Sequence, residues 1–433
     1  MTKIYEPCGL IKEEKPSVSL RFRIFFDGTL NNKENSLDFS KSSKFKVDNG
    51  SYSNDITNIA KLESLLVDDE DADHSIPLYI EGVGTEDGKK DSSYGAGTGF
   101  GDYGVIKKVE KCMEKVGLAI EKRVPDKSIR IKYIYFDVFG FSRGAAAARY
   151  CIHLILVNTW STIAVSGWLA KKGYKSGPVK VKYVGLFDTV ASYGVKHSND
   201  TSDLKLDSVK NAEKVIQIAA AEEHRKNFRL TNIVSAGTKG KEVFIPGVHS
   251  DIGGGYQSGS NENMIVFRAN KGSKQIKKEL NWLVDSGWYK KNEVFLEDRA
   301  EYIPSPGFAP PVRIDYTDIR VKRSGIKNKY SHIPLHLMAD FAREERVVFK
   351  EYMLRGNYGI PTKLEWLKKE IDAQVKLCIT PDYQINNWWI NNSDSMKKVR
   401  NTYFHFSAYY NASFNAHDPQ LKDKKRKRII QNG

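Results

Sequence analysis

The chain has 433 residues, which exceeds the usual size of one domain, so we expect either one large domain with an appendage or two domains around a sizeable core. Its 68 Lys and Arg against 53 Asp and Glu give a formal net charge of +15, which favours anionic surfaces as partners. Charge alone does not separate nucleic acid from acidic phospholipid headgroups, and a soluble protein with a solvated basic face fits equally well.

The N-terminal segment from Met1 to Pro16 carries charges and no apolar run, which excludes an ordinary secretory signal and predicts export, if any, by another route. The four cysteines are widely separated and show no C-x-x-C spacing. We therefore expect unpaired thiols, no metal site and no cofactor. The cysteines are Cys8, Cys112, Cys151 and Cys378.

The first predicted elements are strands at Ser19 to Phe26 and Ile76 to Glu81. A glycine-rich loop from Gly82 to Gly104 follows, and then a helix from about Tyr103 to Arg123. Within this loop, residues 99–104 formally match G-x-G-x-x-G, but the match does not directly follow a strand and lacks the expected βαβ unit. We interpret the loop as a flexible lid or rim, with a dinucleotide site as a remote alternative.

The most informative motif is G-F-S-R-G at residues 140–144. An aromatic and β-branched run from Ile131 to Phe139 precedes it, as expected for a strand buried on both faces, and a helix-forming alanine run starts at Ala145. A serine at such a strand-to-helix turn projects its hydroxyl at a helix N-terminus, where unpaired N–H groups favour negative charge. The motif predicts Ser142 as a nucleophile, with a structural turn as the alternative.

The segment from Tyr150 to Ala170 contains no Lys, Arg, Asp or Glu, and its length would suit a membrane span. Polar residues are scattered through it, which instead favours a buried helix and a loop. Further strands are expected at Val179 to Phe187 and Val243 to Val248. Strands that alternate with helices predict an α/β fold with a mostly parallel sheet and helices on both faces.

A serine nucleophile needs a base and an acid that orients the base. His249 follows a predicted strand, and the carboxyl ends of strands are where catalytic side chains gather in open α/β sheets. Asp188 ends another strand, which gives the α/β-hydrolase order Ser142, Asp188, His249. Asp251 and Asp27 are the second and third candidates for the acid, and a turn or capping role is the alternative for each.

The other histidines, including His224 and His332, are interpreted as structural. An oxyanion at the substrate carbonyl needs preorganised donors. Arg143 would supply one backbone N–H, and Gly28 and Thr29, in the loop after the first strand, would supply the second. A tight turn is the alternative reading of that loop.

The pattern changes after about Asn261, which predicts a catalytic core over residues 1–260 and an accessory region over residues 261–433. Membrane docking is one role for the accessory region, and it could also return strands or helices to the core. The pair Trp388 and Trp389 suits a membrane interface but is more often part of a core. The basic tail from Lys422 to Arg428 is expected to be frayed.

Four blocks carry a resemblance to the type VI secretion lipase effectors, specifically their first, G-x-S-x-G class. The resemblance covers about Arg21 to Tyr256, and the segment Glu222 to Arg225 looks like a family helix. The blocks are F-D-G-T-L-N at residues 26–31, G-F-S-R-G-A at residues 140–145, F-D-T-V at residues 187–190, and P-G-V-H-S-D-I-G-G-G-Y at residues 246–256.

The resemblance implies an α/β-hydrolase that cleaves acyl esters of phospholipids in the membrane of a rival bacterium, using Ser142, Asp188 and His249 of the matching blocks. It also implies delivery through a contractile apparatus, a carrier and a cognate immunity protein. The alternatives are an esterase on another acyl ester and a non-enzymatic basic module that binds nucleic acid or a surface. We expect no nucleic-acid partner, because no recognised motif for one appears.

Overall fold

The computed structural model describes residues 16–38, 50–68, 72–92, 96, 99, 101–193, 198–199, 202–305, 310–377, 393–410, 417–422 and 425–433. Its centre is a six-stranded sheet in the order β2-β1-β3-β4-β7-β9, with every neighbouring pair parallel. The predicted α/β class with a mostly parallel sheet is confirmed. The strands are β1 (Ser17–Phe26), β2 (His74–Ile80), β3 (Arg130–Phe141), β4 (Val179–Phe187), β7 (Lys214–Ala220) and β9 (Gly240–Ile245).

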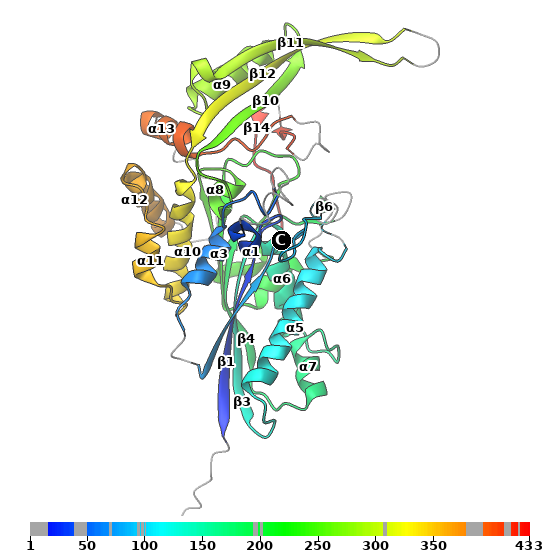
Figure 1. Cartoon of the computed structure of the whole chain (residues 1–433), viewed down its shortest axis with the longest axis vertical. Helices are drawn as coiled ribbons and strands as arrows, with labels where there is room; N and C mark the ends of the chain where they lie inside the picture. The colour runs from blue at the N-terminus through cyan, green and yellow to red at the C-terminus, as the bar shows by residue number, and fades with distance from the viewer. Residues whose placement is uncertain are drawn as a thin grey trace, which may run out of the picture.

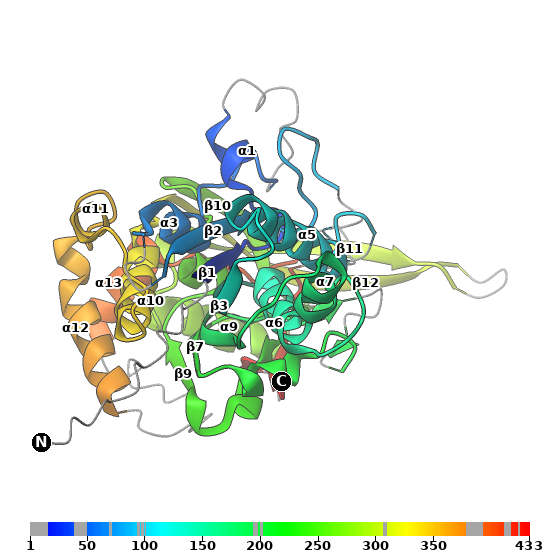
Figure 2. The same cartoon turned by 90° about the horizontal axis from the view of Figure 1, so that it is seen from below.

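Helices cover both faces of this sheet, as Figure 2 shows. On one face, α5 (Val105–Arg123), α6 (Arg143–Leu156) and α7 (Val165–Lys172) pack on one hydrophobic cluster. On the other, α3 (Asn58–Leu65) and α10 (His332–Glu344) pack on a second. Because side chains alternate along a strand, Phe26 joins the first cluster and Phe25 the second, so both faces of β1 are buried.

A second, antiparallel sheet in the order β10-β12-β11 lies beyond the carboxyl end of the first, and its β11–β12 hairpin projects from the molecule (Figure 1). Later segments also return to the first sheet, since α10 contacts β4 and β7. The elements here are β10 (Ser260–Asn270), α9 (Lys274–Asp285), β11 (Val294–Ile303), β12 (Val312–Ile326), α11 (Glu351–Gly356), α12 (Thr362–Leu377) and α13 (Ser393–Tyr403).

The remaining elements are short. They are α1 (Lys33–Leu37), β5 (Ser192–Tyr193), β6 (Ser198–Asn199), η1 (Leu206–Asn211), β8 (Leu230–Thr231), η2 (Val234–Lys239), α8 (His249–Gly253), η3 (Lys291–Glu293), η4 (Lys329–Ser331), β13 (Leu421–Lys422), β14 (Lys425–Arg426) and β15 (Ile430–Gln431).

Two local predictions are wrong. The segment Glu222 to Arg225 is a turn after β7 and not a helix, because its charged side chains bind neighbouring backbone groups and other side chains. The end of the predicted tail, at Arg428, is not frayed, because Arg428 is buried against a carboxylate and the following strand β15 pairs in parallel with β8.

The uncharged segment Tyr150 to Ala170 is divided between the end of α6, a loop and α7. Within the described ranges, no helix combines the length and the apolar character needed to cross a bilayer. Cys112 and Cys151 are buried free thiols. The pair Trp388 and Trp389, and Cys8 and Cys378, lie outside the described residues.

Two glycines allow α6 to pack closely against the strands that precede it. A Cβ added at Gly144 would lie 2.2 Å from the carbonyl oxygen of Asp27, and one added at Gly140 would lie 2.6 Å from the Cα of Ala145. Both contacts are far below van der Waals distance. The glycines of the G-x-S-x-G motif are therefore required by packing between a strand and a helix.

Gly144→Ala is expected to lower the free energy of unfolding by about 1–3 kcal/mol, the usual cost of overpacking a core. Urea denaturation measures the change. Gly356→Ala is the matched control, since a Cβ added at the end of α11 would meet nothing within 4 Å. Equal losses in the two variants would contradict the packing argument.

Candidate active site

Ser142 lies at the sharp turn between β3 and α6. Its backbone has φ 59° and ψ −128°, a conformation that a residue with a side chain rarely adopts. The turn is held by the Ser142 N–H, which donates to the carbonyl of Phe187 at 3.1 Å, and by the Ser142 carbonyl, which accepts from Val190 at 3.3 Å. The serine is therefore fixed against the end of β4.

The structure brings Ser142, His249 and Asp188 together in one hydrogen-bonded chain. His249 Nε2 lies 2.8 Å from Ser142 Oγ, and His249 Nδ1 lies 2.6 Å from Asp188 Oδ2. A carboxylate only accepts hydrogen bonds, so Nδ1 carries the proton and Nε2 presents its lone pair to the serine hydroxyl. The three residues follow β3, β4 and β9, whose carboxyl ends lie at the same edge of the sheet.

Burial sets the electrostatics of this chain, because the exposed fractions are 4% for Ser142, 3% for His249 and 0% for Asp188. Burial lowers the pKa of His249, although the hydrogen bond with Asp188 opposes the shift, so the imidazole is neutral at neutral pH. Burial also disfavours the charged form of Asp188, but Arg428 and His249 outweigh it and hold the pKa of this carboxyl below its usual value.

The turn after β7 supports His249 from behind. Glu223 accepts a hydrogen bond from the backbone N–H of His249 at 3.2 Å, and Arg225 forms an ion pair with Glu223 at 2.9 Å. The rings of Phe141 and Phe228 lie 4.6 Å and 5.0 Å from the imidazole. These contacts restrict the imidazole to the orientation that the serine and the aspartate require.

The other two candidates for the acid are bound elsewhere. Asp251 accepts a hydrogen bond from His405 Nδ1 at 2.8 Å. No sequence motif surrounds His405, so the sequence does not predict this contact. Asp27 accepts from Thr57 at 2.7 Å and from Tyr79 at 2.6 Å. Burial raises the pKa of Asp27 to about 6 despite these hydrogen bonds. Neither carboxyl contacts His249 in the described part of the chain.

The predicted oxyanion donors lie at the turn between β3 and α6 that holds Ser142. Arg143 Nε donates to Thr29 Oγ1 at 2.8 Å, and its guanidinium also donates to the carbonyl of Ala96 in the glycine-rich loop, so this side chain joins both loops to α6. The Gly28 N–H is already used, because it donates to Asp27 Oδ1 at 2.7 Å. Gly28 therefore does not fit the donor role predicted for it, whereas among the described residues no acceptor takes the N–H of Thr29.

His224 and His332 do not belong to this chain of hydrogen bonds. His224 packs edge-on against Trp282, and His332 Nδ1 donates to the carbonyl of Gly359. Burial lowers the pKa of each to about 4. The described residues hold no group of three or more His, Cys, Asp or Glu side chains that could bind a metal ion.

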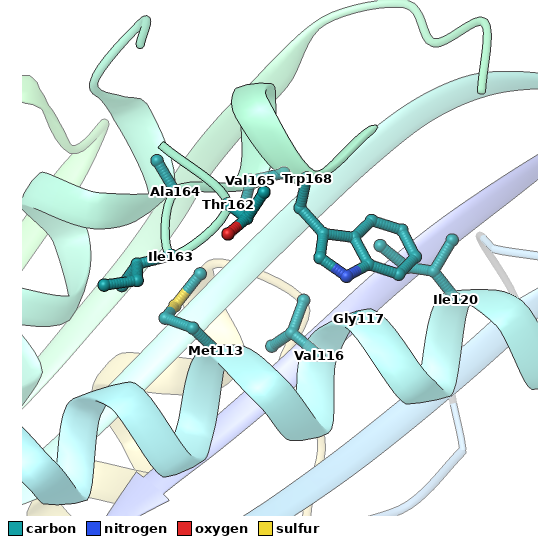
Figure 3. Close-up of a pocket in the computed structure, with 9 residues that line it drawn as sticks. All are labelled: Met113, Val116, Gly117, Ile120, Thr162, Ile163, Ala164, Val165 and Trp168. Atoms are coloured by element: carbon teal, nitrogen blue, oxygen red, sulfur yellow. The ribbon is translucent and has the colours of Figure 1, made fainter. Parts of the chain in front are cut away.

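A small pocket of about 10 Å³ lies between α5 and the segment that leads into α7 (Figure 3). Its lining is apolar apart from Thr162 and includes no predicted site residue. The pocket therefore contributes nothing to the serine site. The lining residues are Met113, Val116, Gly117, Ile120, Thr162, Ile163, Ala164, Val165 and Trp168.

Comparison with known proteins bears on this geometry. Residues 158–286 match the family model of the T6SS phospholipase effector Tle1-like catalytic domain. This segment of the chain is thus similar to the Tle1-like phospholipase catalytic domain of the type VI secretion system. The matched segment holds Asp188 and His249, and Ser142 precedes it. The predicted resemblance to the type VI secretion phospholipase effectors is confirmed over this segment, which holds two of the four sequence blocks.

Two solved structures were found to be similar to this chain. A structure of the Tle1 effector bound to the VgrG spike from the type 6 secretion system superposes with a TM-score of 0.66 at 22% identity, over 100% of this chain and 99% of that chain. An uncharacterized protein from Pseudomonas aeruginosa gives a TM-score of 0.43 at 16% identity, over 83% of this chain and 52% of that chain. No curated protein sequence matches.

The choice of acid can be tested by two matched substitutions. Asp188→Asn should lower kcat by about 10⁴-fold, because the amide no longer holds His249 in the required tautomer. Asp251→Asn should keep most of the esterase activity, since its side chain binds His405 and not His249. Initial rates on a soluble ester measure both. An Asp251→Asn protein that is folded but as inactive as Asp188→Asn would contradict this choice.

Proposed function

We propose that Ser142, His249 and Asp188 form the catalytic triad of a phospholipase A type enzyme, which cleaves the acyl ester bonds of phospholipids through an acyl-enzyme. The observation that carries the proposal is the pair of hydrogen bonds of 2.8 Å and 2.6 Å that joins serine to imidazole and imidazole to carboxylate. A serine activated in this way attacks a trigonal carbonyl carbon, which a phospholipid offers at its acyl esters.

In the first half of the reaction, Ser142 Oγ attacks the ester carbonyl and His249 Nε2 takes the hydroxyl proton. The tetrahedral intermediate then collapses as His249 gives this proton to the leaving glycerol oxygen, which releases a lysophospholipid. Asp188 stabilises the imidazolium that forms between these two steps. The acyl group stays on Ser142 as an ester.

In the second half, His249 takes a proton from water, and the resulting hydroxide attacks the acyl-serine. Collapse returns the proton to Ser142 Oγ and releases the fatty acid. The oxyanion of each intermediate would be bound by the backbone N–H groups of Arg143 and Thr29, with the Arg143 side chain holding the Thr29 loop in place.

We also propose where the enzyme acts and what it meets. Its substrate would be the phospholipid membrane of a target cell, reached by a route that needs no signal peptide. The related Tle1 effector has been solved bound to a VgrG spike, which supports a spike protein of that class as the carrier of this chain. A cognate immunity protein would protect the producing cell.

Ser142→Ala should lower kcat by on the order of a million-fold, as removal of the nucleophile does in a dissected triad. The assay is mass spectrometry of the products from a phospholipid with different acyl chains at its two positions, and the expected products are a free fatty acid and a lysophospholipid. Ser324→Ala, on the exposed face of β12, should match the wild type. Diacylglycerol or phosphatidic acid as the product would refute acyl-ester cleavage.

The pH dependence follows from the burial of His249. Its pKa lies below the ordinary value of 6.5, so the imidazole remains able to accept the serine proton in mildly acidic solution. We expect the acidic limb of the kcat/KM profile to have its midpoint below 6.5, with the rate falling as pH drops through it. A short-chain soluble ester is the substrate, which keeps membrane binding out of the measurement. A midpoint above 6.5 would contradict the argument.

A further inference from the structure

The aspartate of the proposed triad contacts a second charged group that no motif predicts. Arg428 Nη2 donates to Asp188 Oδ1 at 2.9 Å and to Oδ2 at 3.0 Å. Both side chains have an exposed fraction of 0%. Burying a guanidinium costs free energy, and the ion pair with this carboxylate offsets part of that cost.

The guanidinium is directed at the aspartate alone. Among the described residues, the Nε and Nη1 atoms of Arg428 are buried without a hydrogen-bond partner. A structural arginine normally satisfies several of its five donors, as Arg323 does with Glu262, Trp288 and Phe404. The contact with Asp188 is therefore the interaction that Arg428 is positioned to make.

The backbone delivers Arg428 by a specific docking of the C-terminal segment. The strand β15 runs parallel to β8, and the N–H of Leu230 donates to the carbonyl of Ile429 at 2.9 Å. Before it, the N–H of Lys226 donates to the carbonyl of Asp418 at 2.8 Å. The C-terminal segment thus lies alongside the stretch of chain between the turn after β7 and β8.

We propose that Arg428 is a positioning residue of the active site, which keeps Asp188 ionised and holds both of its oxygens so that one faces His249. The inference rests on the proposed function. Without Arg428, His249 and the N–H of Ala220 would be the remaining hydrogen-bond partners of the Asp188 carboxylate among the described residues.

Other charged groups around this pair set the background for its titration. His249 faces Asp188 from α8, Glu223 and His224 act from the turn after β7, and Glu242 acts from β9. Removal of the Arg428 charge would let Asp188 take a proton at higher pH. Alternatively, Asp188 would stay ionised and stabilise the protonated form of His249 more strongly, so that His249 takes its proton at higher pH. Both results move the acidic limb of the kcat/KM profile to higher pH.

The experiment compares the kcat/KM profile of Arg428→Met with that of the wild type on a soluble ester. The expected result is a limb at higher pH and a rate on its acidic side that is lower by on the order of tenfold. Arg428→Lys, which keeps the positive charge, should return the limb toward its wild-type position. A folded Arg428→Met protein with an unshifted limb overturns the proposal.

Arg426→Met is the matched control. Arg426 lies two residues earlier, its side chain is 1% exposed, and it forms an ion pair with Glu279 at 2.6 Å, away from the triad. Its loss should reduce the folded fraction without moving the limb, which is the signature of a structural role. A limb shifted equally in both variants overturns the proposal.

A second measurement applies if Arg428→Met does not fold. The double variant Asp188→Asn and Arg428→Met removes both charges, so it should fold and unfold cooperatively in urea. A double variant that fails to fold, as Arg428→Met alone does in this case, overturns the coupling. The proposed function is judged separately by Ser142→Ala in the wild-type background.

Discussion

The architecture of the site depends on keeping one buried carboxylate charged. Asp188 has no contact with solvent, and the cost of burying its charge must be offset by partners at fixed positions. The N–H of Ala220 from β7, the imidazole from α8 and the guanidinium near the C-terminus supply them. Each partner comes from a different part of the chain, so the site exists only when the strands, α8 and the C-terminal segment have all docked. The geometry of the proposed triad therefore depends on the complete fold.

The parallel sheet explains why these groups converge. All six strands present their carboxyl ends at one edge, and β3, β4 and β9 end at Ser142, Asp188 and His249 or a few residues before them. The register of the strands alone would not fix the position of Ser142 relative to the end of the sheet. The two close glycine contacts fix it, because α6 can start at Arg143 only where Gly140 and Gly144 let backbone meet backbone. Packing between a helix and a sheet thus fixes Ser142 where its hydroxyl can form a hydrogen bond with His249.

The sequence predicts those parts of the site that depend on local pattern and chain order. The turn at Ser142 is predicted by the G-F-S-R-G motif with a hydrophobic strand on one side and an alanine-rich helix on the other. Asp188 and His249 are predicted by their positions at the ends of strands. Arg428 could not be found in this way, since 240 residues separate it from Asp188 and a run of basic residues resembles a solvated tail. The resemblance predicts a helix around Glu223, and the local sequence does not reveal that its carboxylate accepts a hydrogen bond from the backbone N–H of His249. Contacts of long sequence range decide both cases.

A second chain of the same three residue types shows what hydrogen bonds alone do not provide. Asp251 Oδ1 lies 2.8 Å from His405 Nδ1, and His405 Nε2 lies 2.9 Å from Ser260 Oγ. Ser260, however, begins the antiparallel strand β10 and pairs with Ile326, so it has neither a helix N-terminus beneath it nor the strained turn of Ser142. An oxyanion formed at Ser260 would lack the donors that α6 and the Thr29 loop offer at Ser142. Since such preorganised donors supply a large share of the barrier reduction in acyl transfer, the backbone around the serine, and not the Asp-His-Ser chain of contacts, distinguishes the triad proposed at Ser142 from the second chain at Ser260.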